Sequence, residues 1–419
     1  MIPRVRELAA AAARSVEIGR RGWTLLATAF LVDTAFLFVF LIAVQSYLPD
    51  RLHASAAIAG WALGAFGMAK LATQLASGFI ADRVGARRAL MLGTGLLLAG
   101  DVSFLALAHT SPWLVVCAAA VVGLGSSVTW PALYAAADAR FADSEKARFT
   151  ALLTLASGGA LVAGLGGGTL LETTVPFDAA MALPIACVGA ACALALLGRD
   201  HDDARLVTEA PPPSLRDARA IFGERRRVGF ALLVLAEAAA LGALTASFRA
   251  YGRDVLGVSL AREASLLVPA AVLGALLVIP GGALADRIGR ARVLAPGFAT
   301  TAACLAVLSQ VTQPALVIVL AGIAGGAFGL ALPAIAATMM SLASDSANRG
   351  GVIGWFMMMD GIGHATGPVG AAVLIAAFDA SAVLLACGGL FAGVAAIAVA
   401  SQLKAVRTVR IDAVEAQAA

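Results

Sequence analysis

Five ionisable residues stand inside long apolar runs of the sequence, where no water solvates a charged side chain. They are Asp33, Lys70, Asp101, Glu237 and Asp360. A charge near the centre of a bilayer costs about 2.5–3.5 kcal/mol on insertion scales, so such residues indicate a functional site or an internal pair. A carboxylate in apolar surroundings favours its neutral form, so it can bind and release protons near neutral pH. These residues therefore offer proton exchange and attraction of a cationic ligand.

Asp33 and Glu237 are the leading candidates for proton coupling or substrate binding. They are 204 residues apart, which equals the offset of an internal repeat described below. They therefore occupy equivalent positions in the two copies of that repeat. The alternative for each is a structural hydrogen bond between the carboxylate and a nearby backbone group.

Lys70 needs a carboxylate partner, because a buried and unpaired ammonium group is costly. At a rise of 1.5 Å per residue, Asp33, Lys70 and Asp101 lie at a similar depth in their predicted helices. The sequence therefore predicts that Lys70 pairs with one of these two carboxylates, and depth alone leaves both open.

Asp360 and His364 are four residues apart, so they share one face of a helix. A carboxylate beside a histidine can relay protons, and the alternative is that His364 fills a gap beside a glycine run. Further side chains that can line a cavity are Gln45, Trp130, Tyr134, Arg249 and Phe356. Arg249 is equivalent to Gln45 in the repeat, and it can attract an anion or anchor a helix at the membrane interface.

Twelve apolar runs position these residues, and each is long enough to cross about 30 Å of hydrocarbon. Backbone groups in lipid must be paired within the chain, so the runs are predicted to be helices. They cover 22–47, 55–81, 89–109, 112–137, 148–171 and 177–198, and then 228–250, 262–285, 292–312, 314–341, 350–378 and 380–403. The expected fold class is an all-α integral membrane protein, with twelve transmembrane helices in two pseudo-symmetric six-helix bundles.

Lys and Arg residues indicate the orientation, because they are enriched in cytosolic loops. With a cytosolic N-terminus, the 30 Lys and Arg residues all lie in cytosolic segments except Lys70, Arg51, Arg249, Arg253 and Arg262. Both termini are therefore expected in the cytosol. The expected layout is a basic segment (1–21), a first six-helix half (22–198), a cytosolic linker (199–227), a second half (228–403) and a cytosolic tail (404–419).

Composition excludes a water-soluble fold. Hydrophobic residues make up 60% of the chain and charged residues 13%, whereas soluble domains carry about 25% charged residues. The five cysteines lie in apolar runs without paired spacing, so no metal site is expected. The net charge of +4 follows from the basic loops and implies no nucleic-acid partner. No phosphate-binding loop or hydrolase motif occurs, so neither ATP-driven pumping by this chain nor enzyme activity is expected.

The pattern G-x-x-x-D-R-x-G-x-x-R occurs twice, after the second and after the eighth predicted helix. The first copy comprises Gly78, Asp82, Arg83, Gly85 and Arg88, and the second comprises Gly282, Asp286, Arg287, Gly289 and Arg292. A repeat with a period of 204 residues indicates a duplicated six-helix unit. The glycines allow close helix packing, and the aspartates can pair with arginines or cap a helix. We expect such pairs to form when a gate at this end closes and to break when it opens.

This duplicated motif, in a chain with twelve predicted spans and a central polar loop, resembles the signature of the major facilitator superfamily. The resemblance covers essentially the whole chain. It implies alternating access by two rocking halves, a central cavity lined by the first helix of each half, a peripheral third helix, and a monomer. A peripheral third helix favours Asp101 as the partner of Lys70, which leaves Asp33 free to titrate.

The eleventh predicted helix carries a second feature of that family. Gly363, Gly367, Pro368 and Gly370 resemble the glycine-proline motif of its proton-driven exporters. In the family this motif lies in the fifth span, whereas the fifth span here contains glycines but no proline. The run also allows close packing and bending of the helix without any further role.

These features predict a secondary active transporter that exports amphipathic or drug-like small molecules in exchange for protons. The proton gradient is the expected energy source, no cofactor is expected, and the expected location is a bacterial-type cytoplasmic (inner) membrane. One alternative is a proton-coupled symporter or a carrier of sugars, organic acids or lipids. Another, of a different class, is a transport-dead membrane sensor or scaffold.

Overall fold

The computed structural model describes residues 20–48, 57–138, 143–197, 224–344 and 349–418. Every element in this part of the chain is helical. The basic segment up to residue 19 and the linker up to residue 223 lie outside the described residues. The prediction of an all-α chain is confirmed for the rest.

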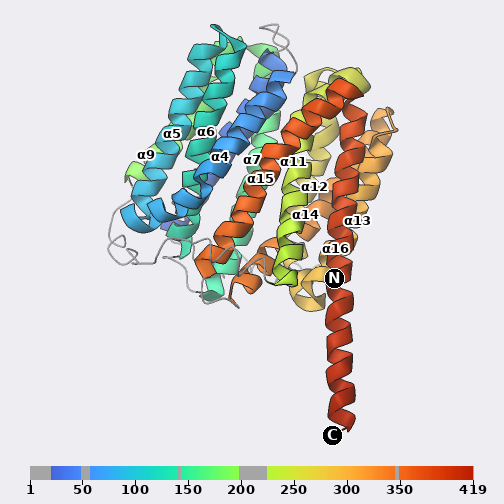
Figure 1. The fold of residues 1–419 in the computed structure, drawn as a ribbon. Coiled ribbons are helices and arrows are strands. Elements are labelled where there is room, and N and C mark those ends of the chain that lie inside the picture. The colour runs from blue at the N-terminus through green and yellow to red at the C-terminus, as the bar shows by residue number, and fades with distance from the viewer. Residues whose placement is uncertain (1–19, 49–56, 139–142, 198–223, 345–348, 419) are drawn as a thin grey trace, which may run out of the picture.

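The described chain forms two successive sets of helices (Figure 1). The first set is α2 (Arg20–Leu37) continued by the π-helix η1 (Phe38–Tyr47), α4 (Ala57–Val84), α5 (Ala86–Ala108), α6 (Pro112–Asp138), α7 (Asp143–Thr174), and the short α8 (Phe177–Ala180) followed by α9 (Ala182–Leu197). The second set is α11 (Arg225–Ala250) continued by the π-helix η3 (Tyr251–Val255), α12 (Leu260–Ile288), α13 (Arg290–Leu308), α14 (Pro314–Ser344), α15 (Arg349–Ala377) and α16 (Ala380–Ala418).

The two sets pack in the same pattern. In the first, α2 contacts α7 and α9, α6 contacts α4 and α5, and α5 contacts α9. In the second, α11 contacts α15 and α16, α14 contacts α12 and α13, and α13 contacts α16. The sets meet where α4 packs on α15 and α7 packs on α12, and these two pairs are themselves equivalent in the repeat. The structure therefore confirms two pseudo-symmetric bundles of six long helices.

Gly85 and Gly289 make the turns at the repeated motif. Their φ angles are 87° and 95°, a region that a Cβ atom makes costly, so glycine suits both turns. The preceding motif residues end α4 and α12, and the following ones begin α5 and α13. We call this the motif end of the bundle, and we call the opposite end, where η1 and η3 lie, the Gln45 end.

The first helix of each set continues as a π-helix toward the Gln45 end. All ten residues of η1 are buried, and η3 is its shorter counterpart. π-Helical segments are rare and are frequent at functional sites. The sequence predicts one regular helix over 22–47. No proline within η1 signals the change from α-helical to π-helical geometry.

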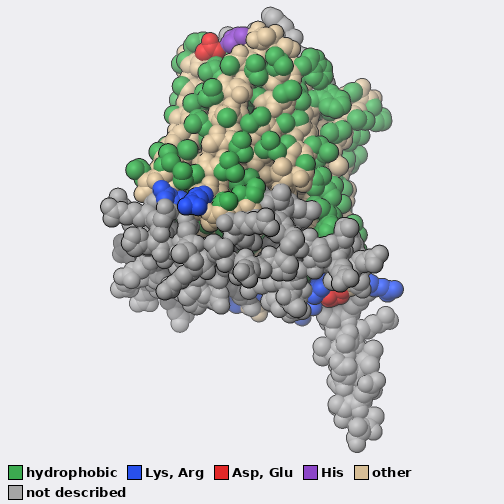
Figure 2. Space-filling view, turned by 60° about the vertical axis from the view of Figure 1, so that its left-hand side comes forward, with side chains coloured by type: hydrophobic (Ala, Val, Ile, Leu, Met, Phe, Trp, Pro, Cys, Tyr) green, Lys and Arg blue, Asp and Glu red, His purple; other side chains and the backbone are tan. Residues whose placement is uncertain are grey.

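The surface of the bundle suits a bilayer. Among the described residues, nine helices are long and apolar enough to cross a membrane. Figure 2 shows hydrophobic side chains across the middle of one face, with Lys and Arg gathered toward the end from which α16 protrudes. The helix α16 continues to Ala418, whereas the sequence analysis ended this span at residue 403 (Figure 1).

Candidate functional site

Lys70 of α4 forms an ion pair with Asp360 of α15, with 3.1 Å between Nζ and Oδ2. The prediction that Lys70 pairs with Asp33 or Asp101 is therefore wrong. Helical rise gives the depth of a side chain but not the direction in which it points. The partner comes from the other half, because α4 packs directly against α15.

Small residues bring α4 and α15 close enough for this pair. A Cβ atom on Gly67 would lie 2.5 Å from the Cα atom of Ala365, so no larger residue fits there. Gly60 meets Ala372 in the same way toward the Gln45 end. The contact of the two backbones holds the halves together one helical turn from the ion pair.

His364 lies on the same face of α15 as Asp360, as predicted. Its Nδ1 is 3.4 Å from Oδ1 of Asp360 and 3.1 Å from the backbone oxygen of that residue. Glu237 of α11 interacts electrostatically with both side chains. The contact of α11 with α15 passes through Gly363 and Gly367, where an added Cβ would collide with the backbone of α11.

Asp33 of α2 approaches this group from the first half. It lies beside Ser157 of α7, which lines the same cavity, and it interacts with the charge of Lys70. Tyr134 of α6 interacts with both Asp33 and Asp360, although 46% of its surface is exposed.

These side chains form one group, which we call the charged cluster. It comprises Asp33 of α2, Lys70 of α4, Glu237 of α11, and Asp360 and His364 of α15. Three carboxylates face one ammonium group and one imidazole, so the cluster attracts protons or a cationic ligand. The side chains of Lys70, Asp360 and His364 are 15%, 23% and 28% exposed, which lets water or a ligand reach them.

A cavity of about 580 Å³ borders the charged cluster at Asp33 and Ser157. The remainder of its wall is almost wholly apolar and comes mainly from α11, α12, α13, α14 and α16. Ligand sites of this kind combine apolar walls with a few placed polar groups, and they range over about 300–1,000 Å³. The cavity is thus large enough for a small organic molecule.

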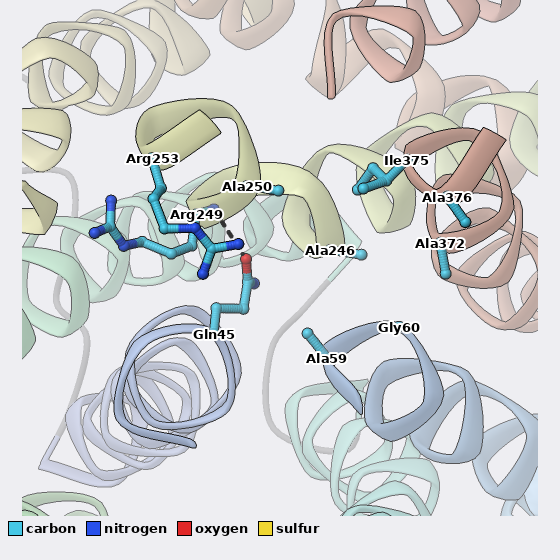
Figure 3. A pocket seen from close by; sticks show the side chains of 10 residues that line it. All are labelled: Gln45, Ala59, Gly60, Ala246, Arg249, Ala250, Arg253, Ala372, Ile375 and Ala376. Carbon is cyan, nitrogen blue, oxygen red and sulfur yellow. Dashed lines mark hydrogen bonds between the residues drawn. The ribbon is translucent and has the colours of Figure 1, made fainter. Parts of the chain in front are cut away.

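The two halves also bind each other at the Gln45 end. The side-chain amide of Gln45 donates a hydrogen bond to the Thr245 carbonyl, and its oxygen accepts one from the Arg249 backbone N–H at 3.1 Å (Figure 3). Gln45 and Arg249 are 204 residues apart, so equivalent positions of the repeat touch each other. They line a small pocket of about 200 Å³.

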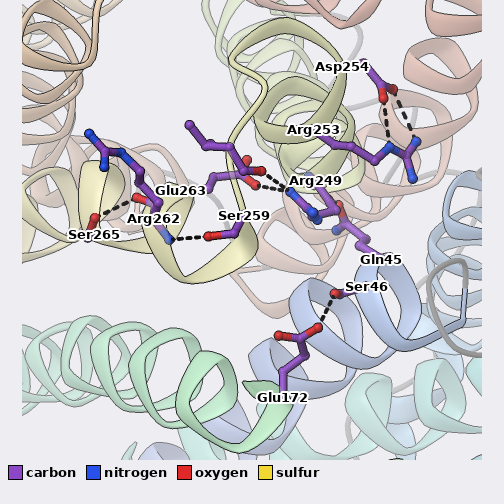
Figure 4. Close-up of polar contacts among 11 residues, drawn as sticks. Gln45, Ser46, Glu172, Arg249, Arg253, Asp254, Ser259, Arg262, Glu263 and Ser265 are labelled. Atoms are coloured by element: carbon purple, nitrogen blue, oxygen red, sulfur yellow. Dashed lines mark hydrogen bonds and ion pairs between the residues drawn. The ribbon is translucent and has the colours of Figure 1, made fainter. Parts of the chain in front are cut away.

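Arg249 is held by its own half and is not available as a free cation. Its guanidinium lies 3.3 Å from the carboxylate of Glu263, which is fully buried, and donates to the Val258 carbonyl at 3.0 Å (Figure 4). Arg253 is similarly paired with its neighbour Asp254 at 2.7 Å. These carboxylates neutralise the positive charge at the Gln45 end, which disfavours the interpretation of Arg249 as an anion-binding residue.

Several predicted residues lie outside the charged cluster. Asp101 is buried in α5, where its electrostatic neighbour is Cys187 of α9. Phe356 is fully buried against Phe230 at 4.9 Å between ring centroids, and it is not among the residues that line the two cavities described here. Gly370 is exposed with open space beside it, so it takes no part in the packing predicted for the glycine-proline run.

Two other members of the predicted set, Pro368 and Trp130, have partial support. Pro368 packs against Gly242 of α11. Trp130 lies 6.1 Å from Tyr134, between ring centroids, on the face of α6 that Tyr134 shares.

The side chains of Asp82, Arg83 and Asp286 lie outside the described part of the structure, so the gating pairs of the repeated motif stay a prediction.

Sequence reasoning missed Ser157 and Glu263. Ser157 precedes a glycine run in the fifth span, and nothing in its spacing marks it as a partner of Asp33. Glu263 stands at the beginning of the eighth span, where a charge reads as a helix boundary. Only the fold shows that it is buried beneath Gly252, at which any Cβ atom would overlap the carboxylate.

Comparison with known proteins agrees with the duplicated architecture. A sequence model of the Major Facilitator Superfamily matches residues 25–284 and 261–411. The chain is 31% identical over 124 residues to the uncharacterized MFS-type transporter YttB of Bacillus subtilis, which is 30% of this chain and 31% of that protein. It is 34% identical over 145 residues to the multidrug resistance protein MdtH of Yersinia enterocolitica, which is 34% of this chain and 35% of that protein. Each match spans about a third of the relative.

Solved structures share the fold over almost the whole chain. The nucleoside transporter NupG superposes with a TM-score of 0.71 at 14% identity, covering 91% of this chain and 99% of that one. The human organic anion transporter MFSD10 superposes with a TM-score of 0.68 at 14% identity, covering 90% and 99%. At such low identity these likenesses establish the arrangement of the helices and leave the cargo to be argued from the site.

Proposed function

On the premise that the chain belongs to the major facilitator superfamily, and is therefore a membrane transporter rather than an enzyme, we propose that it exports amphipathic or drug-like small molecules in exchange for protons. The two halves, 22–198 and 228–403, rock about the charged cluster and open the central space to one side of the membrane at a time.

One observation supports this proposal above the others: the charged cluster joins the halves. Asp33 and Lys70 belong to the first half, and Glu237, Asp360 and His364 belong to the second. Rocking of the halves must change the distances within the cluster. A change of protonation in one carboxylate therefore alters the energy of both conformations, and this is the requirement for coupling proton movement to a conformational change.

The cycle follows from the position of Asp33 at the edge of the cavity. In its ionised form Asp33 attracts a cationic cargo from the cytosol. Protonation from the outside neutralises the carboxylate and releases the cargo, and loss of the proton to the cytosol restores the site. Glu237 can hold the proton in the same way, because it faces Asp360 and His364 from α11.

The remaining features of the proposal concern location and direction. Basic residues concentrate in the predicted loops of the motif end, so this end faces the cytosol together with both termini, in a bacterial-type cytoplasmic membrane. The multidrug resistance protein MdtH, which the chain resembles over 145 residues, favours export of drug-like compounds. The transporter acts as a monomer on a small-molecule substrate.

Gradient-driven transport in proteoliposomes tests this function. Vesicles with an imposed pH gradient are given radiolabelled lipophilic cations, sugars and organic acids, and uptake is compared among wild type, Asp33→Asn and Glu237→Gln. The control is Asp178→Asn, which neutralises an exposed carboxylate on α8. We expect wild type and the control to move the cation only with the gradient, and at least one cluster variant to lose the gradient dependence.

Other outcomes decide against the proposal. Movement of sugars or organic acids in the same direction as protons would favour the symporter or carrier. No transport of any cargo by correctly folded wild type would favour a sensor or scaffold. If both cluster variants behave like Asp178→Asn, the two carboxylates are structural.

A further inference from the structure

We infer that the apolar end of the cargo is bound mainly by the second half, in the cavity beside Asp33, and that this end carries aromatic rings. The cargo is then a lipophilic aromatic monocation that lies off the pseudo-symmetry axis, with its charge at Asp33. This inference rests on the proposed function and adds to it a ligand class and an orientation.

The cavity belongs mainly to one half. Five helices of the second half supply most of its wall, while the first half contributes a short stretch of α2 with η1 and another of α7. A site on the pseudo-symmetry axis would draw on both halves equally. The asymmetry therefore needs a cause in the two halves' own residues.

The internal repeat supplies that cause. With the offset of 204, Phe40 is equivalent to Leu244 and Phe66 is equivalent to Ala270. In the first half, Phe40 and Phe66 pack together at 5.1 Å between ring centroids, and Phe36 lies within 5.0 Å of both. In the second half, Leu244 and Ala270 line the cavity. The first half is thus filled by aromatic side chains at the positions where the second half is hollow.

The far wall of the cavity is aromatic. Phe328 of α14 and Phe391 of α16 line it at 6.0 Å between ring centroids, and Phe298 of α13 stacks on Phe391 at 5.5 Å. Such rings bind other rings in tilted or stacked geometries and stabilise them beyond the effect of the buried area. They also attract a cation over their faces. The wall therefore favours an aromatic ligand over an acyl chain.

Charge selects the other end of the ligand. Among the described residues that line the cavity, Asp33 alone belongs to the Asp, Glu, Lys, Arg and His types. Ser157 is the neighbouring polar residue from α7 that lines the cavity beside it. Lys70, the nearest cation, is engaged by Asp360 at 3.1 Å. A single positive charge on the ligand is therefore matched at the rim, and the remainder of the ligand meets apolar surface.

The test fills the cavity with the side chain that the first half already uses. Ala270→Phe and Leu244→Phe introduce phenylalanine at the positions equivalent to Phe66 and Phe40. The matched control is Leu276→Phe, on the exposed face of the same helix as Ala270. Equilibrium binding of radiolabelled tetraphenylphosphonium and tetraethylammonium is measured with purified protein. The two cations have the same charge, but only the first carries aromatic rings.

We expect tetraphenylphosphonium to bind at least tenfold more weakly to Ala270→Phe and Leu244→Phe, and within twofold of wild type to Leu276→Phe. Tetraethylammonium is expected to bind all three variants within twofold of wild type, whereas Asp33→Asn weakens both cations. Leu244→Phe keeps the test decisive if Ala270→Phe does not fold, because replacing leucine with phenylalanine adds less volume to the wall than replacing alanine does.

Two outcomes overturn the inference. One is unchanged tetraphenylphosphonium binding when the folded protein carries either filling substitution. The other is a wild type that binds tetraphenylphosphonium no more tightly than tetraethylammonium. The binding assay needs no proton gradient. If the binding results are as expected but the pH gradient drives no transport, only the proposed proton coupling is contradicted. If the pH gradient does drive transport but Ala270→Phe and Leu244→Phe bind tetraphenylphosphonium as wild type does, only the inference about the cavity is contradicted.

Discussion

Replacing Lys70 with methionine removes the charge that Asp360 faces and keeps a side chain of similar length. Two unit charges about 4 Å apart attract by about 4 kcal/mol at an effective dielectric constant of about 20. Removal of one partner from a buried pair costs about 3–5 kcal/mol, because the other charge stays buried. His364 remains 3.4 Å from Asp360, so we expect Lys70→Met to destabilise the protein by about 3 kcal/mol, at the lower end of that range.

A double-mutant cycle measures this interaction directly. Lys70→Met, Asp360→Asn and the double variant are heated in detergent with a fluorescent maleimide, which reacts with the buried Cys304 and Cys387 only after unfolding. The exposed Cys117 reacts before unfolding and gives the baseline. We expect the double variant to be more stable than Lys70→Met, with a coupling energy of at least about 1 kcal/mol. Additive effects of the two substitutions would refute the ion pair and with it the link between α4 and α15.

Three further predictions concern the contact of the halves and the limits of the charged cluster. Gly67→Ala should lower stability by about 1–3 kcal/mol in the same thermal assay, because its Cβ meets the backbone of α15, while Gly95→Ala, with open space beside it, should melt as wild type does. Gln45→Ala removes two hydrogen bonds between the halves, each worth about 1 kcal/mol, so maleimide labelling of Ala59→Cys in the adjacent pocket should rise by up to about thirtyfold; unchanged labelling would mean that Gln45 does not hold this end closed. Asp101→Asn should keep gradient-driven transport within twofold of wild type, and a loss of coupling would place Asp101 in the proton path.

The helices and the shared face of Asp360 and His364 were predictable because each rests on a local pattern. Apolar runs located the twelve long helices to within a few residues at most ends, and α16 is the main exception. The predicted shared face of Asp360 and His364 also follows from helix geometry within one element. Neither conclusion requires knowledge of how separate helices meet.

The partner of Lys70 was not predictable in this way. Helical rise places Asp33 and Asp101 at about the depth of Lys70. The choice of its carboxylate partner depends on which helices are in contact. The packing of Gly67 on Ala365 decides that choice, and it brings Lys70 to a carboxylate of the other half. A single sequence carries no direct signal for such a contact between halves.

The cavity was predictable in principle but was not predicted. The exchange of Phe66 for Ala270 and of Phe40 for Leu244 is visible once the repeat is aligned. Its meaning depends on the structure, because only the packing shows that these positions face the interior of each half. A comparison of side-chain volume between the two copies of a repeat is therefore informative about where a duplicated transporter is hollow.

The central claim is that proton movement and cargo movement are coupled through the charged cluster. The most direct test is the reciprocal of gradient-driven transport: proteoliposomes without a pH gradient receive an outward gradient of tetraphenylphosphonium, and an internal dye reports the pH. The proposed mechanism predicts that wild type carries protons inward as the cation leaves, so the lumen becomes acidic, and that Asp33→Asn does not. Cation efflux with no change of internal pH, or with protons moving outward alongside it, would contradict the mechanism.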